Sequence, residues 1–143
     1  MKINNQIIEL IAIGLGVLIV VVVMFIFLLK KRRKLDNKSY KARWKAITKL
    51  LAHKTKWKDA VILADNLLDE ILKKKHYKGK TMGERMVSAQ HDIKNNDMLW
   101  FSHKFKNKII NDNVDLNKNE VKKTLLGFWQ ALKDLGAFDK DEK

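Results

Sequence analysis

A run of twenty residues without a charged side chain, Leu10 to Leu29, constrains this chain more than any other feature. At ~1.5 Å of helical rise per residue, such a run spans the ~30 Å hydrocarbon core of a bilayer. A bilayer offers no hydrogen-bond partners to backbone amides, so an apolar segment of this length crosses it as a helix. The sequence therefore predicts a single N-terminal transmembrane helix, with residues 1–29 forming this helix and the flank before it.

Five basic residues follow the run directly: Lys30, Lys31, Arg32, Arg33 and Lys34. A cleaved signal peptide would instead have its basic residues before an apolar core of about 7 to 15 residues, with a small-residue cleavage site after it. Basic residues just after a span mark its cytoplasmic side. We therefore expect a single-pass protein of the cell membrane, with the N-terminus outside and the C-terminal domain in the cytoplasm.

The positive charge is concentrated beside the predicted membrane helix. Residues 30–45 hold nine Lys or Arg against Asp36 alone, in a chain of net charge +14. Anionic lipid headgroups attract each such residue by ~1 kcal/mol near the surface. We predict that Lys30 to Lys34 contact lipid headgroups and that the lipid bilayer is a partner of the protein.

The rest of the chain is predicted to be all-α. The sequence has no Pro and only six Gly, which leaves few sites for the tight turns of a β-sheet. Hydrophobic residues at helical spacing predict a small cytoplasmic bundle of four to five helices over residues 55–138. A basic juxtamembrane segment and connecting helix precede it over residues 30–54, and a disordered tail follows over residues 139–143.

Local signals predict where the helices begin and end. Asn37 or Ser39 is expected to cap the connecting helix, which could also continue the membrane helix. Thr55 is expected to begin a core helix with the clearest apolar stripe, from Trp57 to Leu72, and Gly79 to end it. Further boundaries are predicted at Thr81 with Glu84 as a capping box, at Asn95 to Asp97, at Asn117 with Glu120, and at Gly136.

The segment from Met98 to Asn111 carries large groups on two helical faces. Its first face holds Met98, Ser102, Phe105 and Ile109, and its second face holds Trp100, His103, Asn107 and Asn111. Two such faces predict a helix in the centre of the bundle, whose polar groups need partners if they are buried. Asp65, at the edge of the apolar stripe of the preceding core helix, is expected to be solvated or in a surface ion pair.

No metal or cofactor site is predicted. The chain has no Cys, and its four His, His53, His76, His91 and His103, lie in separate segments without the spacing of a helical zinc motif. Gly79-Lys80-Thr81 matches the end of a phosphate-binding loop. However, Lys74 stands where that motif needs its first glycine, and a helix is expected where the motif needs a strand.

Three stretches resemble the HEPN superfamily: Ala64-Asp65-x-Leu67-Leu68-Asp69, Gly79-Lys80-Thr81-Met82-Gly83-Glu84-Arg85, and Leu99-Trp100-x-x-His103-Lys104. The match covers about residues 57–138 and looks like uncharacterised membrane-anchored relatives from small-genome bacteria. The resemblance implies a small helical bundle in which an Arg-Asn-x-x-x-His stretch cleaves RNA, typically across a dimer. In this chain Lys106 stands in place of the Arg, Asn107 matches, and Asn111 replaces the His.

These replacements degrade the chemistry that the family motif needs. An Asn amide does not titrate near neutral pH, whereas His does, and general acid–base catalysis typically contributes about 10²- to 10⁴-fold to a rate. Lys also lacks the bidentate fork with which Arg grips phosphate. His103 is the candidate substitute base. Its alternative role is that of a partly buried histidine hydrogen-bonded within the bundle.

Three functions remain as hypotheses. The leading one is a non-catalytic, membrane-anchored domain that binds or scaffolds an unknown protein partner or a second copy of itself. The alternative is a HEPN-type ribonuclease with a displaced or degraded site, in which His103, Lys106 and Asn107 line a groove. The least favoured is nucleic-acid binding without cleavage, which needs a basic face with stacking aromatic rings. All four Trp are instead expected in the core: Trp44, Trp57, Trp100 and Trp129.

Overall fold

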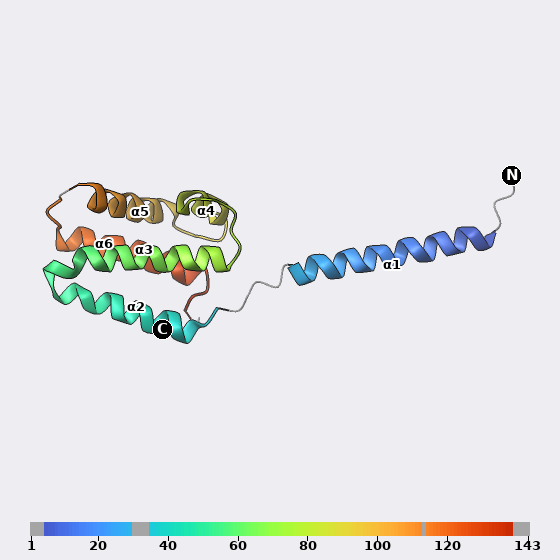
Figure 1. Ribbon diagram of the computed structural model, residues 1–143, viewed down its shortest axis with the longest axis horizontal. Helices are drawn as coiled ribbons and strands as arrows, with labels where there is room; N and C mark the ends of the chain where they lie inside the picture. The colour runs from blue at the N-terminus through green and yellow to red at the C-terminus, as the bar shows by residue number, and fades with distance from the viewer. Residues whose placement is uncertain (1–4, 30–34, 113, 139–143) are drawn as a thin grey trace. The chain divides into compact units, whose positions relative to one another are not determined.

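The computed structural model describes residues 5–29, 35–112 and 114–138, and these residues contain helices and no strand (Figure 1). The elements are α1 (Asn5–Leu29), α2 (Asn37–Lys49), η1 (Leu50–Ala52), η2 (Lys54–Lys56), α3 (Trp57–Lys74), α4 (Met82–Ala89), α5 (Asn96–Asn111) and α6 (Lys118–Asp134). The η elements are short 3-10 helices. The predicted all-α class is confirmed, and four α-helices, α3 to α6, lie within the predicted bundle of residues 55–138.

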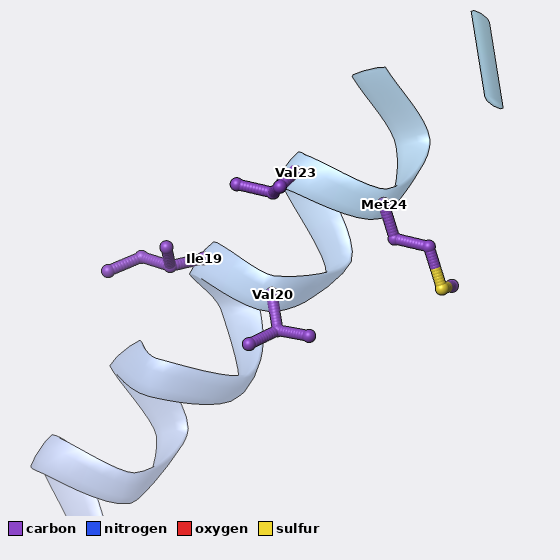
Figure 2. A pocket seen from close by; sticks show the side chains of 4 residues that line it. All are labelled: Ile19, Val20, Val23 and Met24. Atoms are coloured by element: carbon purple, nitrogen blue, oxygen red, sulfur yellow. The ribbon is translucent and has the colours of Figure 1, made fainter. Parts of the chain in front are cut away.

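The chain divides into two compact units, residues 1–33 and residues 34–143. In the first unit, the segment Ile7–Ile26 of α1 is long and apolar enough to cross a membrane, and none of it is buried against protein. Figure 2 shows Ile19, Val20, Val23 and Met24 standing outward from α1 around a shallow hollow. A single helix supplies only one wall, so this hollow is not an enclosed site. The basic residues 30–34 and the tail 139–143 lie outside the described residues, and their predicted roles stay predictions.

In the second unit, α3 is the central helix. It contacts α2, α4, α5 and α6, and Figure 1 shows it in the middle of the bundle with α2 on one side and α5 on the other. Its buried residues include the whole predicted stripe: Trp57, Ala60, Val61, Ala64, Asp65, Leu67, Leu68, Ile71 and Leu72. The prediction that the Met98 to Asn111 segment would be central was wrong. That helix, α5, packs mainly on α6 with its first face and turns its second face toward α3.

Helix α2 belongs to the bundle rather than to a separate connecting segment. Tyr40 and Ile47 are buried, and the Tyr40 hydroxyl donates to Glu70 Oε1 of α3 over 3.0 Å. Asp36, not Asn37 or Ser39, caps α2 and accepts from the Ser39 amide at 3.2 Å. Because Asp36 is not helical, α1 and α2 are two separate helices.

The two ends of α3 also differ from the sequence-based expectation. Thr55 lies in η2, and α3 begins at Trp57 without a side-chain cap. At its end, His76 takes the left-handed conformation expected of Gly79, with φ 61°. The Tyr77 amide donates to the Leu72 carbonyl at 3.1 Å and the His76 amide to the Lys73 carbonyl at 2.9 Å, which is a Schellman motif.

The remaining predicted boundaries agree with the structure in position. The side chains of Thr81, Asn95 and Asn117 each accept an amide hydrogen bond at a helix start, and Gly136, with φ 75°, follows the end of α6. The capping box differs in detail, because Glu84 accepts from the Lys80 amide at 2.7 Å. Asn117 accepts from Asn119 at 2.8 Å rather than from Glu120.

Gly127 allows α5 and α6 to approach closely. A β-carbon at this position would overlap Ser102 Oγ and would lie 2.8 Å from the carbonyl oxygen of Met98. The Ser102 hydroxyl donates back to that same carbonyl at 2.9 Å, so its hydrogen-bonding need is met within α5. The contact explains why the first face of α5 carries a small residue between larger apolar ones.

Candidate functional site

The residues from Gly79 to Arg85 stabilise the loop between α3 and α4 and do not form a phosphate-binding loop. Arg85 is buried and donates to Asp69 Oδ1 over 2.8 Å and 2.6 Å, and to the carbonyl oxygens of Gly79 and Lys80 over 2.8 Å and 3.1 Å. A β-carbon on Gly79 would lie 2.6 Å from Glu84 Cβ, and its φ of 147° favours glycine. Helix α3, not a strand, precedes the loop. The residues of the motif are therefore explained by local structure.

Asp69 is held as a carboxylate by this arrangement. Partial burial raises the pKa of Asp69, but hydrogen bonds from Lys73 and Arg85 and their positive charges outweigh burial and bring the pKa below its ordinary value. The Asp69 contacts join two turns of α3 to the start of α4. This cluster stabilises the loop and leaves no free group for chemistry.

A second polar cluster, formed by four side chains of α3 and α5, is the candidate site. We call it the quartet: Asp65, His103, Lys106 and Asn107. Asp65 Oδ1 lies 2.8 Å from His103 Nδ1, and Asp65 Oδ2 lies 2.9 Å from Lys106 Nζ. Lys106 Nζ also donates to Asn107 Oδ1 over 3.0 Å, and Asn107 Nδ2 lies 3.4 Å from His103 Nε2. The four side chains close a ring of contacts.

Helical spacing explains how α5 supplies three members of the ring. His103 and Asn107 are four residues apart and share one face, while Lys106 is three residues from His103 on the same side. Asp65 comes from the opposite wall, on the buried side of α3, where Val61 and Leu68 flank it in the stripe. The expectation that Asp65 is solvated or in a surface pair was wrong, because α5 covers it: its side chain is only 4% exposed.

The donors and acceptors of the quartet fit one set of protonation states. If His103 carries its proton on Nδ1, that N–H donates to the Asp65 carboxylate, and Nε2 is left to accept from the Asn107 amide. Lys106 then balances the charge of Asp65 and donates to the carbonyl oxygen of Asn107. In this state each contact joins a donor to an acceptor, and the buried carboxylate is paired on both oxygens, as buried charges require.

The predicted site residues are therefore only partly brought together. His103, Lys106 and Asn107 meet in the quartet, and the side chains of His103 and Lys106 are 12% and 15% exposed. Asn111 lies exposed at the end of α5, and within the part of the chain that the structure describes no hydrogen bond joins it to the quartet. Asp65 is the member that sequence analysis missed. Its position at the border of an apolar stripe was the available signal.

An aromatic ring lies beside the quartet. The Trp100 ring stands edge-on to the His103 ring, with 6.2 Å between ring centroids. Among the residues that the structure describes, there is no cluster of three or more His, Cys, Asp or Glu able to hold a metal ion. The quartet can orient an imidazole and hold one balanced ion pair.

Among the residues that the structure describes, no ring contact joins one Trp to another, while Phe101 stacks on Phe105 at 6.1 Å and Lys123 Nζ lies 4.4 Å from the Phe101 ring centroid. Trp57 is buried, and Trp44 and Trp100 pack against the core. Trp129 departs from the expectation, because it is only partly buried and Lys133 Nζ lies 5.1 Å from its ring centroid. One such ring beside one lysine is a local cation–π contact.

A scan against protein-family models, a search of curated proteins and a search of solved structures each found no match to this chain. Its function must therefore be inferred from its own residues.

Proposed function

We propose that the protein is a single-pass membrane protein whose helical bundle acts in the cytoplasm as a non-catalytic domain for protein binding or scaffolding. The observation that carries this proposal is α1, in which the large apolar side chains from Ile7 to Ile26 are about half or more exposed. In water such a surface would be strongly unfavourable, whereas a bilayer covers all sides of a lone helix. The basic residues 30–34 supply the orientation signal.

The quartet supports a non-catalytic role for the bundle. A general base must reach its substrate. The His103 side chain is only 12% exposed, and its two ring nitrogens face Asp65 and Asn107. Lys106 is held by Asp65 and is not displayed for phosphate. The Asn111 amide, at the position where HEPN relatives carry His, does not titrate near neutral pH.

Membrane insertion can be tested with the full chain in vesicles that are washed at high salt and floated on a density gradient. Wild type should float, and Val17→Lys/Val21→Lys should not, since a Lys near the centre of a span costs roughly 3 kcal/mol. The Val17→Leu/Val21→Leu variant is the matched control and should float. Proteolysis of oriented vesicles should cut the bundle only from the cytoplasmic side.

Protein binding can be tested by crosslinking pull-down of the intact protein from membrane fractions. The exposed Lys108 and Asn111 offer a surface on α5 outside the quartet. A specific partner, or a second copy of the chain, should be lost in Lys108→Glu/Asn111→Lys. It should be kept in the matched Lys122→Asn/Lys123→Asn variant on α6. Equal capture by both variants would speak against binding through this face.

A HEPN-type ribonuclease is the second candidate, and the Asp65–His103 contact favours it. A buried carboxylate on Nδ1 is the arrangement that orients a histidine base, with Nε2 toward the substrate. For this activity Asn107 would have to turn away from Nε2, which its exposed side chain allows. Cleavage of RNA by the full chain, lost in His103→Gln and Asp65→Asn but kept in Asp59→Asn, would establish this function and refute the non-catalytic one.

A further inference from the structure

A third face of α5 is turned away from both of the helices on which α5 packs. Its first face packs on α6, and its second face carries His103 and Lys106 toward α3. The third face lies opposite to these two residues around the helix. Three of its side chains are exposed and the fourth, a Phe, is half-buried. We call this face the outer stripe: Asp97, Phe101, Lys104 and Lys108.

The outer stripe has an apolar centre that α6 extends. Lys123 Nζ of α6 lies 4.4 Å from the centroid of the Phe101 ring, so this ring lies beside α6. Leu126 is one turn further along α6, on the same side as Lys123, and it is 45% exposed. The neighbouring Gly127 lies against Ser102, which places Leu126 level with the middle of the stripe.

The charges of the outer stripe are not paired within the bundle. In the part of the chain that the structure describes, no ion pair includes Asp97, Lys104 or Lys108. The helix dipole favours an acid at the start of α5 and a cation near its end, which accounts for Asp97 and Lys108. It does not account for the apolar groups that stay exposed between them.

The spacing of the outer stripe is the same in both directions along α5. Its gaps of four, three and four residues are symmetric about a point midway between Phe101 and Lys104. If a second copy of α5 lies antiparallel across this point, Asp97 faces Lys108 of the second copy. Phe101 then faces the aliphatic stem of Lys104 of the second copy. Twofold symmetry repeats both contacts and brings the two copies of Leu126 together beside them. A parallel pair would instead place like charges opposite one another.

We propose that the outer stripe and Leu126 bind a second copy of the chain in an antiparallel, twofold contact between the α5 helices. The inference rests on the proposed function and names its binding partner. Exposed ion pairs around a small apolar centre give a weak contact in solution. Anchoring both chains in one bilayer raises their local concentration, so a weak contact is sufficient there.

Disulfide formation tests the antiparallel arrangement with the full chain in vesicles, because the chain has no Cys of its own. A mixture of Asp97→Cys chains and Lys108→Cys chains should form the mixed disulfide on mild oxidation. In this pair one Asp97–Lys108 contact stays intact. Disulfides between like positions should be at least about tenfold rarer, since these positions lie about 16 Å apart along the helix. An excess of disulfides between like positions would overturn the proposal.

Charge reversal tests the ion pairs, with energy transfer between donor- and acceptor-labelled Ser39→Cys chains in vesicles as the measurement. Asp97→Lys and Lys108→Asp should each weaken association by about tenfold or more, because symmetry places like charges together twice. A mixture of these two variants should recover association to within about threefold of wild type, since each chain then complements the other. Lys45→Asp, on an exposed position of α2, makes the same charge change as Lys108→Asp and should leave association unchanged.

The mixture separates a lost contact from a lost fold, because a second misfolded chain cannot rescue the first. Failure of the mixture to recover, or association that neither reversal weakens, would overturn the proposal. A wild-type chain that floats but stays monomeric at every protein-to-lipid ratio would overturn it alone and leave a different protein as the scaffold's partner. A chain that does not float would refute the anchor and this inference together.

Discussion

Replacing Asp65 with Asn tests whether the quartet is one coupled unit. The substitution keeps the shape of the side chain but removes the charge that both His103 and Lys106 contact. The carboxamide oxygen can still accept from His103 Nδ1. Its NH₂ group would then face Lys106 Nζ, and two donors cannot pair. Lys106, with a side chain 15% exposed, becomes a mostly buried cation without its counter-ion.

The expected loss follows from the burial of the pair. Removing one partner of a buried ion pair costs about 3–5 kcal/mol, and partial exposure lets the Lys106 ammonium turn toward water. We expect Asp65→Asn to lower the free energy of unfolding by about 2–3 kcal/mol, and Lys106→Met in that background to restore about 1 kcal/mol or more. Asp59→Asn is the matched control: Asp59 is exposed on the same helix, pairs with Lys56, and should cost less than about 0.5 kcal/mol.

Urea unfolding of the full chain in detergent micelles, followed by Trp fluorescence, measures these differences. Trp100 reports on the quartet directly because its ring lies beside that of His103. An Asp65→Asn loss no larger than that of Asp59→Asn would refute the reasoning, because the quartet would then behave as a solvated surface pair. A double variant no more stable than Asp65→Asn would contradict the coupling between Asp65 and Lys106.

Three further predictions concern the bundle. Gly127→Ala should destabilise it by about 2 kcal/mol through overpacking between α5 and α6. Gly83→Ala is the control in the same urea titration: its β-carbon would lie 3.6 Å from the Trp100 ring, so the change should be neutral or stabilising. His76→Gly should raise the free energy of unfolding by about 0.5–1 kcal/mol, because the left-handed conformation costs glycine nothing; an unchanged midpoint would contradict this. Since the pKa of Asp69 is lowered in the folded state, its stabilising effect is complete above the unfolded-state pKa of about 4 and is lost as pH falls through the lower folded value. Asp69→Asn should therefore flatten the acid side of the stability–pH profile, and a profile parallel to wild type would exclude the effect.

Helix identity and most helix boundaries could be read from the sequence because they depend on near neighbours. The apolar stripe of α3, the caps at Thr81, Asn95 and Asn117, and the stop at Gly136 each involve residues within one or two turns. The errors in the α3 boundaries have a local explanation as well. A Schellman turn accepts a non-glycine residue such as His76 at a modest cost, which composition does not reveal.

The candidate site was less predictable, since its partners are far apart in the chain. Asp65 and His103 are separated by 38 positions, and only the packing of α5 on α3 joins them. The sequence indicated that the second face of α5 would need polar partners if buried. It could not indicate that one acid at a stripe border supplies them, because an exposed and a buried border position have the same periodicity.

The sequence by itself determined a long apolar helix, a basic segment after it and an all-α domain, because length, charge and the 3.6-residue period are properties of single segments. Only the tertiary structure decided that α3 rather than α5 is central, that α2 belongs to the bundle, and that His103 and Lys106 are paired with a buried carboxylate. Each of these outcomes depends on which helix faces cover one another. That choice is made by the packing of the whole core, not by any one helix.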